Sequence, residues 1–147
     1  MQTRYHVQIK LANYGDAEKF LRLEAKCFGM KVNHDTIYFW TPAVSYLWSY
    51  KAEINGQIVG GIIAMPTRNG CWYVNSLFVH PSYRKHGIAT RLLSKITKVA
   101  GKKGIFLDVL RDRPSLVAFY GKNGFKFKKL MKNYYSDGED RYLLVHV

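Results

Sequence analysis

Two Asn-Gly pairs constrain the fold of this chain more than any other feature of its sequence. Asn55-Gly56 separates the strand-like runs LWSYKAEI and QIVGGIIAMP, and Asn69-Gly70 separates the second of these from CWYVNSLFV. Asn-Gly is typical of tight hairpins, because both residues accept a positive φ angle. The sequence therefore predicts three consecutive antiparallel strands, of which the last spans residues 71–79.

Before these strands the sequence is less regular. Residues 4–11 alternate as a strand does, and Asp16 is a suitable N-cap for a helix that continues to Phe28. Residues 29–46 are irregular and aromatic, and Pro42 breaks the pattern. We expect a short second helix or a substrate-shaping loop in this segment.

After the three strands, helical and strand-like patterns alternate. Five elements are expected: a helix at 87–102, a strand at 104–110, a helix at 114–122, and strands at 125–130 and 141–147. A strand reached through a helix is expected to run parallel to the strand before it. The order predicts an α/β fold with a mixed sheet (an α+β arrangement), with about seven strands and about four helices in a single domain over residues 1–147.

The bulk composition is that of one folded domain. A chain of 147 residues can bury a sizeable core. No apolar run approaches the ~20 residues that span a bilayer, and the first residues do not open a signal peptide. Cys27 and Cys71 match no metal or redox spacing, so we expect buried free thiols, no metal site and a cytoplasmic location.

The net charge of +13 is unevenly distributed. Residues 76–147 contain 15 Lys+Arg and 5 Asp+Glu, against 8 and 5 in residues 1–75. A field of this sign favours polyanionic partners such as phosphates, RNA or an acidic protein. A solvated basic surface with no such partner explains the charge equally well.

The segment HPSYRKHGIAT, residues 80–90, joins the third hairpin strand to the next helix. A helix N-terminus leaves backbone N–H groups unpaired and carries the positive end of the helix dipole. Gly87 lets the backbone approach a bulky anion, and Arg84 and Lys85 add positive charge. The junction is therefore built like a pyrophosphate cradle, although it is neither a P-loop nor a dinucleotide-binding GxGxxG motif.

This junction also resembles a family signature. Arg84-x-x-Gly87-x-Ala89 is similar to the Q/R-x-x-G-x-G/A acetyl-CoA motif of the GNAT superfamily of N-acetyltransferases. The resemblance implies the GNAT acyl-CoA N-acyltransferase fold and acetyl-CoA (coenzyme A) as the donor. The residues implied in cofactor binding are Leu77, Phe78, Val79, Arg84, Lys85, His86, Gly87, Ile88, Ala89, Thr90 and Tyr120.

Two later blocks extend the resemblance along the whole chain. LDVLRDRPSLVAFYGKNGFKF (107–127) resembles the family's second motif, but Arg113 replaces an asparagine that contacts the pantetheine arm. NYYSDGEDRYLL (133–144) is similar to the tail of the protein N-terminal acetyltransferase branch, which includes the ribosomal-protein alanine acetyltransferases.

The resemblance also implies catalytic roles. Tyr120 would donate the proton that the departing thiolate needs, because a phenol remains a donor until pH ~10. The backbone N–H groups of residues 77–79 would polarise the thioester carbonyl. Two residues are candidates for the general base, Asp108 and Tyr73. An ordinary aspartate (pKa ~3.9) is a poor base, so it would need a bridging water or a raised pKa.

A weak base favours one kind of acceptor. An α-amine (pKa ~7.7–8.0) is partly neutral at pH 7, whereas a lysine amine (pKa ~10.4) is almost wholly charged. The resemblance therefore favours a peptide or protein N-terminus as acceptor. The substrate-binding candidates are Glu24, Phe28, Tyr134 and Tyr135.

Several alternatives remain open. One fold serves many amines, so the acceptor could be a small molecule, a lysine side chain or an aminoacyl-tRNA. A non-enzymatic basic module that binds RNA belongs to a different class, and nucleic acid remains a possible partner of the basic surface. The sequence does not indicate an oligomeric state, and no membrane partner is expected.

Overall fold

The computed structural model describes residues 4–147, which form two compact units. The first unit extends to Met65 and resumes at residues 75–99, and the second comprises residues 66–74 and 100–147. The strand β4 belongs to both units, because it begins in the second and ends in the first.

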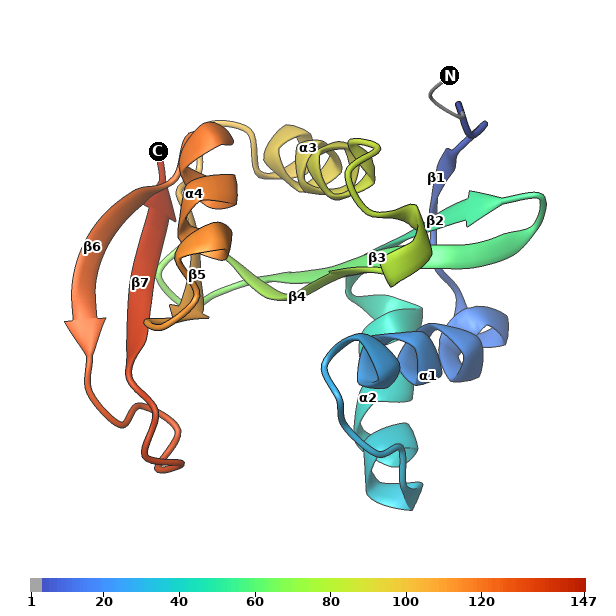
Figure 1. The fold of residues 1–147 in the computed structure, drawn as a ribbon, viewed down its shortest axis with the longest axis horizontal. Coiled ribbons are helices and arrows are strands. Elements are labelled where there is room, and N and C mark those ends of the chain that lie inside the picture. The colour runs from blue at the N-terminus through green and yellow to red at the C-terminus, as the bar shows by residue number, and fades with distance from the viewer. Residues whose placement is uncertain (1–3) are drawn as a thin grey trace. The chain divides into compact units, whose positions relative to one another are not determined.

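Residues 4–147 form the predicted number of strands and helices (Figure 1). The strands are β1 Gln8–Leu11, β2 Trp48–Ile54, β3 Gln57–Pro66, β4 Trp72–Val79, β5 Ile105–Leu110, β6 Lys126–Met131 and β7 Arg141–His146. The α-helices are α1 Ala17–Cys27, α2 His34–Tyr46, α3 Ile88–Ala100 and α4 Pro114–Lys122, with 3₁₀ turns η1 Tyr14–Asp16 and η2 Pro81–Tyr83. The strand order is β1-β2-β3-β4-β5-β7-β6, so the predicted mixed α/β fold is confirmed.

The first Asn-Gly pair forms the expected tight hairpin. Asn55 and Gly56 have φ angles of 50° and 76°, and Ile54 pairs with Gln57 across the turn. Two positive φ angles in a two-residue loop are typical of a type I′ turn. This turn sets the antiparallel register of β2 and β3.

The second Asn-Gly pair lies in a longer loop. Only Gly70 has a positive φ angle (82°), and the Gly70 N–H donates to the Thr67 carbonyl at 3.0 Å. The Thr67 N–H donates in turn to the Cys71 carbonyl at 2.8 Å. The prediction that both residues take positive φ was therefore wrong here, because Asn69 instead uses its side chain to accept from the Cys71 N–H at 3.2 Å.

The second unit contains both parallel and antiparallel strand pairs. β4 and β5 run parallel, as predicted, and their ladder consists of Trp72–Ile105 and Tyr73–Phe106. β7 then pairs antiparallel with β5 on one side and with β6 on the other. The last strand of this series, β6, is an edge strand with a register shift between Phe127 and Lys129, and its first four residues are exposed.

The start of α1 differs from the prediction in its capping. Asp16 is the N-cap by position but makes no side-chain cap hydrogen bond to α1. Its carboxylate accepts from the Asn13 N–H at 3.0 Å and from the Lys51 ammonium at 2.8 Å. Asp16 therefore closes the capping box of η1 and forms an ion pair with β2.

The segment after α1 forms a full helix rather than a loop. Asn33 caps α2 by accepting from the Thr36 N–H at 2.8 Å, and the helix continues past Pro42. A proline inside a helix removes a hydrogen bond and is costly. The prediction of Pro42 as a breaker was wrong, because the packing of Ala43 and Val44 in the core of the first unit outweighs that cost.

The core of the first unit lies around α1. Phe20 and Leu21 are fully buried, and the Phe20 ring contacts that of Phe78 edge to face at 5.0 Å. Gly61 on β3 faces these two rings so closely that a Cβ atom there would overlap Phe20. α3 presents Leu92, Leu93 and Ile96 as its buried face, as its periodicity predicted.

In the second unit, aromatic side chains pack together at the end of α4. The Tyr120 ring contacts that of Phe125 at 5.5 Å, and Phe125 contacts His146 of β7 at 5.3 Å. Gly124 ends α4 with a φ angle of 89°, which glycine tolerates best. No helix formed by residues 4–147 is long and apolar enough to cross a membrane.

Candidate active site

The predicted site residues divide between the two units. The first unit contains the end of β4, the strand-to-helix junction and α1, with all the cofactor-binding candidates except Tyr120 and with two substrate-binding candidates. The second unit contains the remaining candidates, which are Tyr73, Asp108, Tyr120, Tyr134 and Tyr135.

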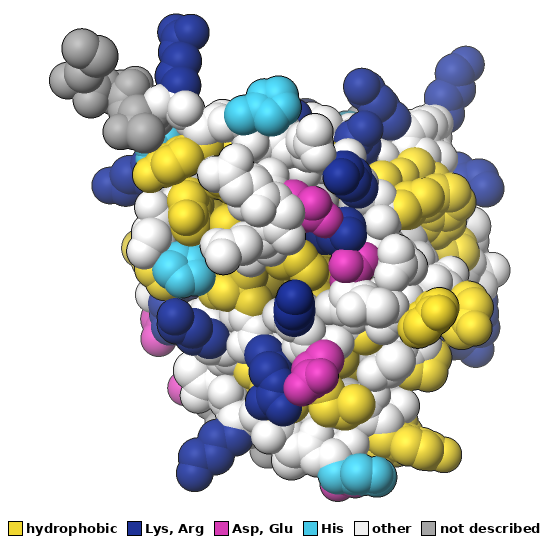
Figure 2. Space-filling view, turned by 90° about the vertical axis from the view of Figure 1, so that its right-hand side faces the viewer, with side chains coloured by type: hydrophobic (Ala, Val, Ile, Leu, Met, Phe, Trp, Pro, Cys, Tyr) yellow, Lys and Arg dark blue, Asp and Glu magenta, His cyan; other side chains and the backbone are white. Residues whose placement is uncertain are grey.

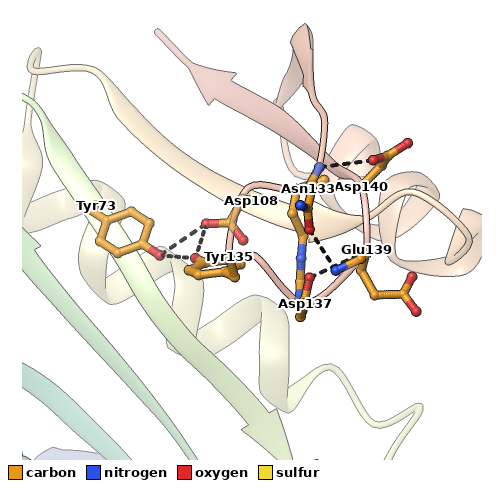
Figure 3. Close-up of polar contacts among 9 residues, drawn as sticks. Tyr73, Asp108, Asn133, Tyr135, Asp137, Glu139 and Asp140 are labelled. Atoms are coloured by element: carbon orange, nitrogen blue, oxygen red, sulfur yellow. Dashed lines mark hydrogen bonds and ion pairs between the residues drawn. The ribbon is translucent and has the colours of Figure 1, made fainter.

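In the second unit, three of the predicted residues form a hydrogen-bonded cluster (Figure 3). The Asp108 Oδ2 atom accepts from the Tyr135 hydroxyl at 2.8 Å and from the Tyr73 hydroxyl at 3.1 Å. The two hydroxyl oxygens are themselves 3.4 Å apart. The structure therefore brings both candidate bases together and adds Tyr135, which comes from the loop between β6 and β7.

Both tyrosines of this cluster remain protonated. Burial raises the pKa of Tyr73 well above its usual range, and the nearby Asp108 charge raises it further. Burial likewise raises the pKa of Tyr135. A phenol whose pKa is raised keeps its proton, so it can donate a hydrogen bond but does not act as a base. Tyr73 is therefore suited to be a hydrogen-bond donor to Asp108.

Tyr120 is the most deeply buried tyrosine among the catalytic candidates. Its side chain lies on α4 and the residue is 8% exposed. Burial raises the pKa of Tyr120 well above its usual range, and the negative charge of Asp108 adds to this effect. The phenol therefore retains its proton at any physiological pH, as a proton donor must.

The β6–β7 loop, residues 132–140, is held by its own hydrogen bonds. The Asn133 side chain accepts from the Gly138 N–H at 2.6 Å, and Asp140 accepts from the Asn133 N–H at 3.0 Å. Positive φ angles at Asn133 (48°) and Ser136 (58°) turn the chain sharply. The carboxylate of Asp137 is also occupied locally, since it pairs with Arg141 at 3.2 Å.

In the first unit, the strand-to-helix junction has the features expected of an anion site. Lys85 and Gly87 take positive φ angles of 64° and 76°, and the Gly87 carbonyl accepts from the Arg91 N–H at 3.1 Å as the first bond of α3. Among residues 4–147, no acceptor is recorded for the backbone N–H groups of residues 85–90. A Cβ at Gly87 would project into open space. These residues fit a pyrophosphate.

Arg84 is anchored beside this junction. Its Nε donates to the Val79 carbonyl at 2.9 Å, which fixes the guanidinium at the end of β4. The Cys27 thiol also donates to this carbonyl, at 3.5 Å. Burial raises the pKa of Cys27, and the Arg84 charge opposes that effect. Both cysteines are free, as predicted, but they are half-buried rather than buried.

The end of β4 departs from simple strand alternation. Phe78 and Val79 are consecutive and both are buried, whereas residues 72–77 alternate in burial. The His80 N–H donates to the Val59 carbonyl at 2.7 Å. A local irregularity of this kind is compatible with the predicted role of the 77–79 backbone, which remains a prediction.

The two substrate-binding candidates of α1 have different environments. Burial raises the pKa of Glu24, and the Ser76 hydroxyl of β4 opposes that shift. The contact with Glu24 is not a hydrogen bond of ordinary geometry, because the buried Ser76 Oγ has no partner of that kind among residues 4–147. Phe28, at the C-cap of α1, is 53% exposed.

Sequence reasoning missed two contributors to the site. Arg141 lies over the Tyr135 ring at 4.9 Å, and Ser76 lies beside Glu24. The tail motif contains Arg141, so a positive charge near an aromatic pair was a usable signal. Nothing in the sequence indicated Ser76. No group of three or more metal-ligating side chains occurs in the part of the chain that is described.

The strand order and the positive φ angles of the junction after β4 agree with the fold that the sequence resemblance implies. A model of the acetyltransferase (GNAT) family matches residues 17–125, and the chain belongs to this family. It is therefore an N-acetyltransferase whose acetyl donor is acetyl-CoA.

Individual relatives agree with this assignment. An N-alpha-acetyltransferase of Sulfurisphaera tokodaii is 28% identical over an alignment 157 positions long, which covers 93% of this chain and 90% of the relative. The Escherichia coli ribosomal-protein-S18-alanine N-acetyltransferase has the same fold, with a TM-score of 0.82, 18% identity and coverage of 96% and 93%. Arabidopsis thaliana NAA60, solved with acetyl-CoA, also has a TM-score of 0.82, with 18% identity and coverage of 96% and 99%.

Proposed function

We propose that this protein transfers the acetyl group of acetyl-CoA to the N-terminal α-amine of a protein or peptide. The Asp108 carboxylate bonded to Tyr73 and Tyr135 carries this proposal, because it provides one weak proton acceptor beside protonated donors. The resemblance of the sequence to N-alpha-acetyltransferases supports the same acceptor.

Acetyl-CoA, when bound, supplies an acetyl group activated as a thioester. The backbone N–H groups at the start of α3 would hold its pyrophosphate, and Arg84 and Lys85 would add positive charge. Gly87 keeps the backbone accessible to this anion. The N–H groups of residues 77–79 would orient the thioester carbonyl.

Proton transfers are assigned to residues of the second unit. Asp108 takes the proton of the attacking amine, directly or through one water. Tyr120 Oη gives its proton to the departing sulfur, since burial keeps this phenol protonated. Tyr73 donates a hydrogen bond to Asp108 and does not need to lose its proton.

The acceptor follows from the strength of this base. A carboxylate acts as a base only toward an amine that is already partly neutral, and an α-amine (pKa ~7.7–8.0) satisfies this condition near pH 7. A lysine amine (pKa ~10.4) does not. Tyr134 and Tyr135 would contact the first residues of the peptide, Phe28 is a further substrate-binding candidate, and Glu24 would help to place the amine.

The direct test is the release of free thiol from acetyl-CoA in the presence of short peptides. Each peptide is offered with its α-amine free or blocked, and the first residue is varied. We expect turnover on free α-amines only, with a preference for certain first residues.

Controls separate the remaining alternatives. Turnover on blocked lysine peptides or on spermidine would overturn the α-amine assignment within the family. Tight acetyl-CoA binding without turnover on any of these amines would favour aminoacyl-tRNA. Salt-dependent RNA binding without thiol release would favour a binding module. A cytoplasmic location and a single domain over residues 1–147 remain predictions from the sequence.

A further inference from the structure

The two oxygens of Asp108 have different surroundings. Oδ2 accepts both tyrosine hydroxyls, from Tyr135 at 2.8 Å and from Tyr73 at 3.1 Å. No donor to Oδ1 is recorded among residues 4–147. One oxygen of the carboxylate is therefore occupied by two phenols, and the other remains available (Figure 3).

Both phenols are held in place by contacts of their own. The Tyr73 ring stacks on Phe106 with centroids 5.2 Å apart and an interplanar angle of 28°. The Tyr135 ring contacts Tyr134 edge to face at 4.8 Å and lies under the Arg141 guanidinium at 4.9 Å. Packed rings with limited rotamer freedom can fix the orientation of the carboxylate that accepts from them.

We propose that Tyr73 and Tyr135 are positioning residues, and that their hydrogen bonds give the two oxygens of Asp108 different roles. Oδ2 is the anchoring oxygen, which fastens the 132–140 loop to β5 through Tyr135. Oδ1 is the oxygen that accepts the proton of the amine. The anchoring role stands on geometry alone, whereas the role of Oδ1 rests on the proposed function.

The proton balance of this step is simple. An N–H bond of the acceptor breaks, directly or through one water, and an O–H bond forms on Oδ1. The phenolic protons of Tyr73 and Tyr135 stay on their oxygens, because both tyrosines act as donors throughout. The Oδ1 proton is later lost to solvent, which restores the carboxylate.

Several groups of the second unit surround this carboxylate. Tyr73 comes from β4 and Tyr135 from the loop. Tyr120 comes from α4 and is close enough for the Asp108 charge to raise its pKa. Arg141 comes from β7 and contacts the Tyr135 ring. Asp108 therefore accepts hydrogen bonds from two phenols, and its charge also acts on the third, Tyr120.

Asp108→Asn separates the two roles. An asparagine carbonyl oxygen can replace Oδ2 and accept both phenols, whereas the amide NH₂ at the position of Oδ1 cannot accept a proton. Hydrogen exchange at the Asn133, Ser136, Gly138 and Glu139 amides should stay within about twofold of wild type. Turnover at pH 7 should fall by about 100-fold or more and recover partly as the pH rises and the α-amine deprotonates.

Asp108→Ala and Tyr135→Phe test the anchor itself. Each change removes the Tyr135–Asp108 hydrogen bond, so exchange of the same loop amides should become roughly tenfold faster. Adding Tyr135→Phe to Asp108→Ala should accelerate exchange no further, because both changes break the same hydrogen bond, between Tyr135 and Asp108. Tyr134→Phe is the matched control, since this hydroxyl makes no recorded bond to Asp108, and exchange should stay at the wild-type rate.

Three results would overturn the proposal. The anchoring role fails if Asp108→Asn loosens the loop as much as Asp108→Ala does, or if Tyr135→Phe leaves exchange unchanged. The assignment of Oδ1 fails if Asp108→Asn retains full turnover at pH 7. Failure of the proposed function has a different signature: the wild-type protein would acetylate no free α-amine, while the exchange results would still test the anchor.

Discussion

At the scale of single residues, the surroundings of Tyr120 determine the protonation state of its hydroxyl. Its hydroxyl belongs to a residue that is only 8% exposed, in the second unit that contains Asp108. Burial and the nearby negative charge both raise the pKa of Tyr120, so its neutral form persists to higher pH than that of an ordinary tyrosine. Only the neutral form can donate a proton.

Removal of this hydroxyl should affect the chemical step. We expect Tyr120→Phe to lower kcat by about 100-fold or more, as is usual for a lost general acid, with little change in the KM for acetyl-CoA. Thiol-release kinetics at saturating peptide measure both quantities. A variant with wild-type kcat would show that the departing sulfur obtains its proton elsewhere.

The raised pKa of Tyr120 predicts the shape of the pH profile. The donor is intact below its pKa, and because that pKa is raised, no loss of the donor occurs up to pH ~10. Wild-type kcat/KM should therefore rise between about pH 7 and 8 as the α-amine deprotonates and then stay level to pH ~10. A fall at pH ~9 in protein that remains folded by circular dichroism would contradict this assignment.

Gly87 provides a test of the anion cradle. Gly87→Ala places a Cβ at a φ angle of 76° beside the predicted pyrophosphate position, so we expect the Kd for acetyl-CoA to rise about tenfold or more. The measurement is isothermal titration calorimetry.

Gly101→Ala is the matched control for the strain. Gly101 also has a positive φ angle (62°) with open space around its Cβ, but it follows α3 instead of preceding it. Both variants should lose about 1–2 kcal/mol of stability. Equal losses of coenzyme affinity in the two variants would argue against the cradle.

At the scale of elements, most of the fold could be predicted from local pattern. The Asn55-Gly56 turn, the α3 periodicity and the limits of α4 at Pro114 and Lys122 all matched, because each signal is contained within a few residues. The failure at Pro42 has its cause in tertiary context. α2 continues through Pro42, because burial of Ala43 and Val44 compensates for the lost hydrogen bond.

The residues of the candidate site could be predicted from the sequence, but the contacts among them could not. The resemblance selected Tyr73, Asp108 and Tyr135, which are 35 and 27 residues apart along the chain. Nothing in a single sequence states that two phenols share one oxygen, because this depends on the register of β4 against β5 and on the loop conformation. Arg141 over Tyr135 was missed for the same reason.

The packing of α1 on β3 gives a prediction at this scale. Gly61→Ala would place a Cβ into the space of the Phe20 ring and close to Phe78, so we expect a loss of about 1–3 kcal/mol in the free energy of unfolding. Urea denaturation followed by tryptophan fluorescence measures this.

The control is Gly121→Ala, in a helix with nothing within 4 Å of the added Cβ. This change should be neutral or stabilising by about 0.4–1 kcal/mol. An equal loss in both variants would show that close packing around Gly61 is not the cause.

At the scale of the whole molecule, the net charge of +13 governs long-range behaviour. Figure 2 shows one face, over which lysine and arginine side chains are spread with few acidic ones. β6 alone contributes Lys126, Lys128 and Lys129, all exposed, and none of them is in a recorded ion pair among residues 4–147.

A charged surface of this kind should bind polyanions weakly and with steep salt dependence. We expect the affinity for single-stranded RNA to fall by at least tenfold between 50 and 200 mM salt, a range over which about 6–10 phosphate contacts typically cost about 10³–10⁵. Fluorescence anisotropy measures the slope of log K against log[salt]. Binding that does not change with salt would contradict a purely electrostatic origin.

Charge reversals at two places on the chain test whether RNA binds at one surface or is attracted by the net charge. Reversing the three β6 lysines to glutamate is compared with the same reversal at Lys19, Lys26 and Lys31, which are exposed in the first unit. Equal effects on the slope would indicate diffuse attraction by net charge. A larger effect of the β6 change would locate the contact on this edge.

The form of β6 also affects how the protein behaves when it is concentrated. Its unpaired backbone edge could in principle accept a strand from another molecule and so start a growing stack. The register shift after Phe127 bends the strand, and two such edges brought together would place lysine against lysine. The β6 edge thus disfavours edge-to-edge association of sheets. The chain should remain dispersed at concentrations where an uncharged, straight edge would seed fibrils.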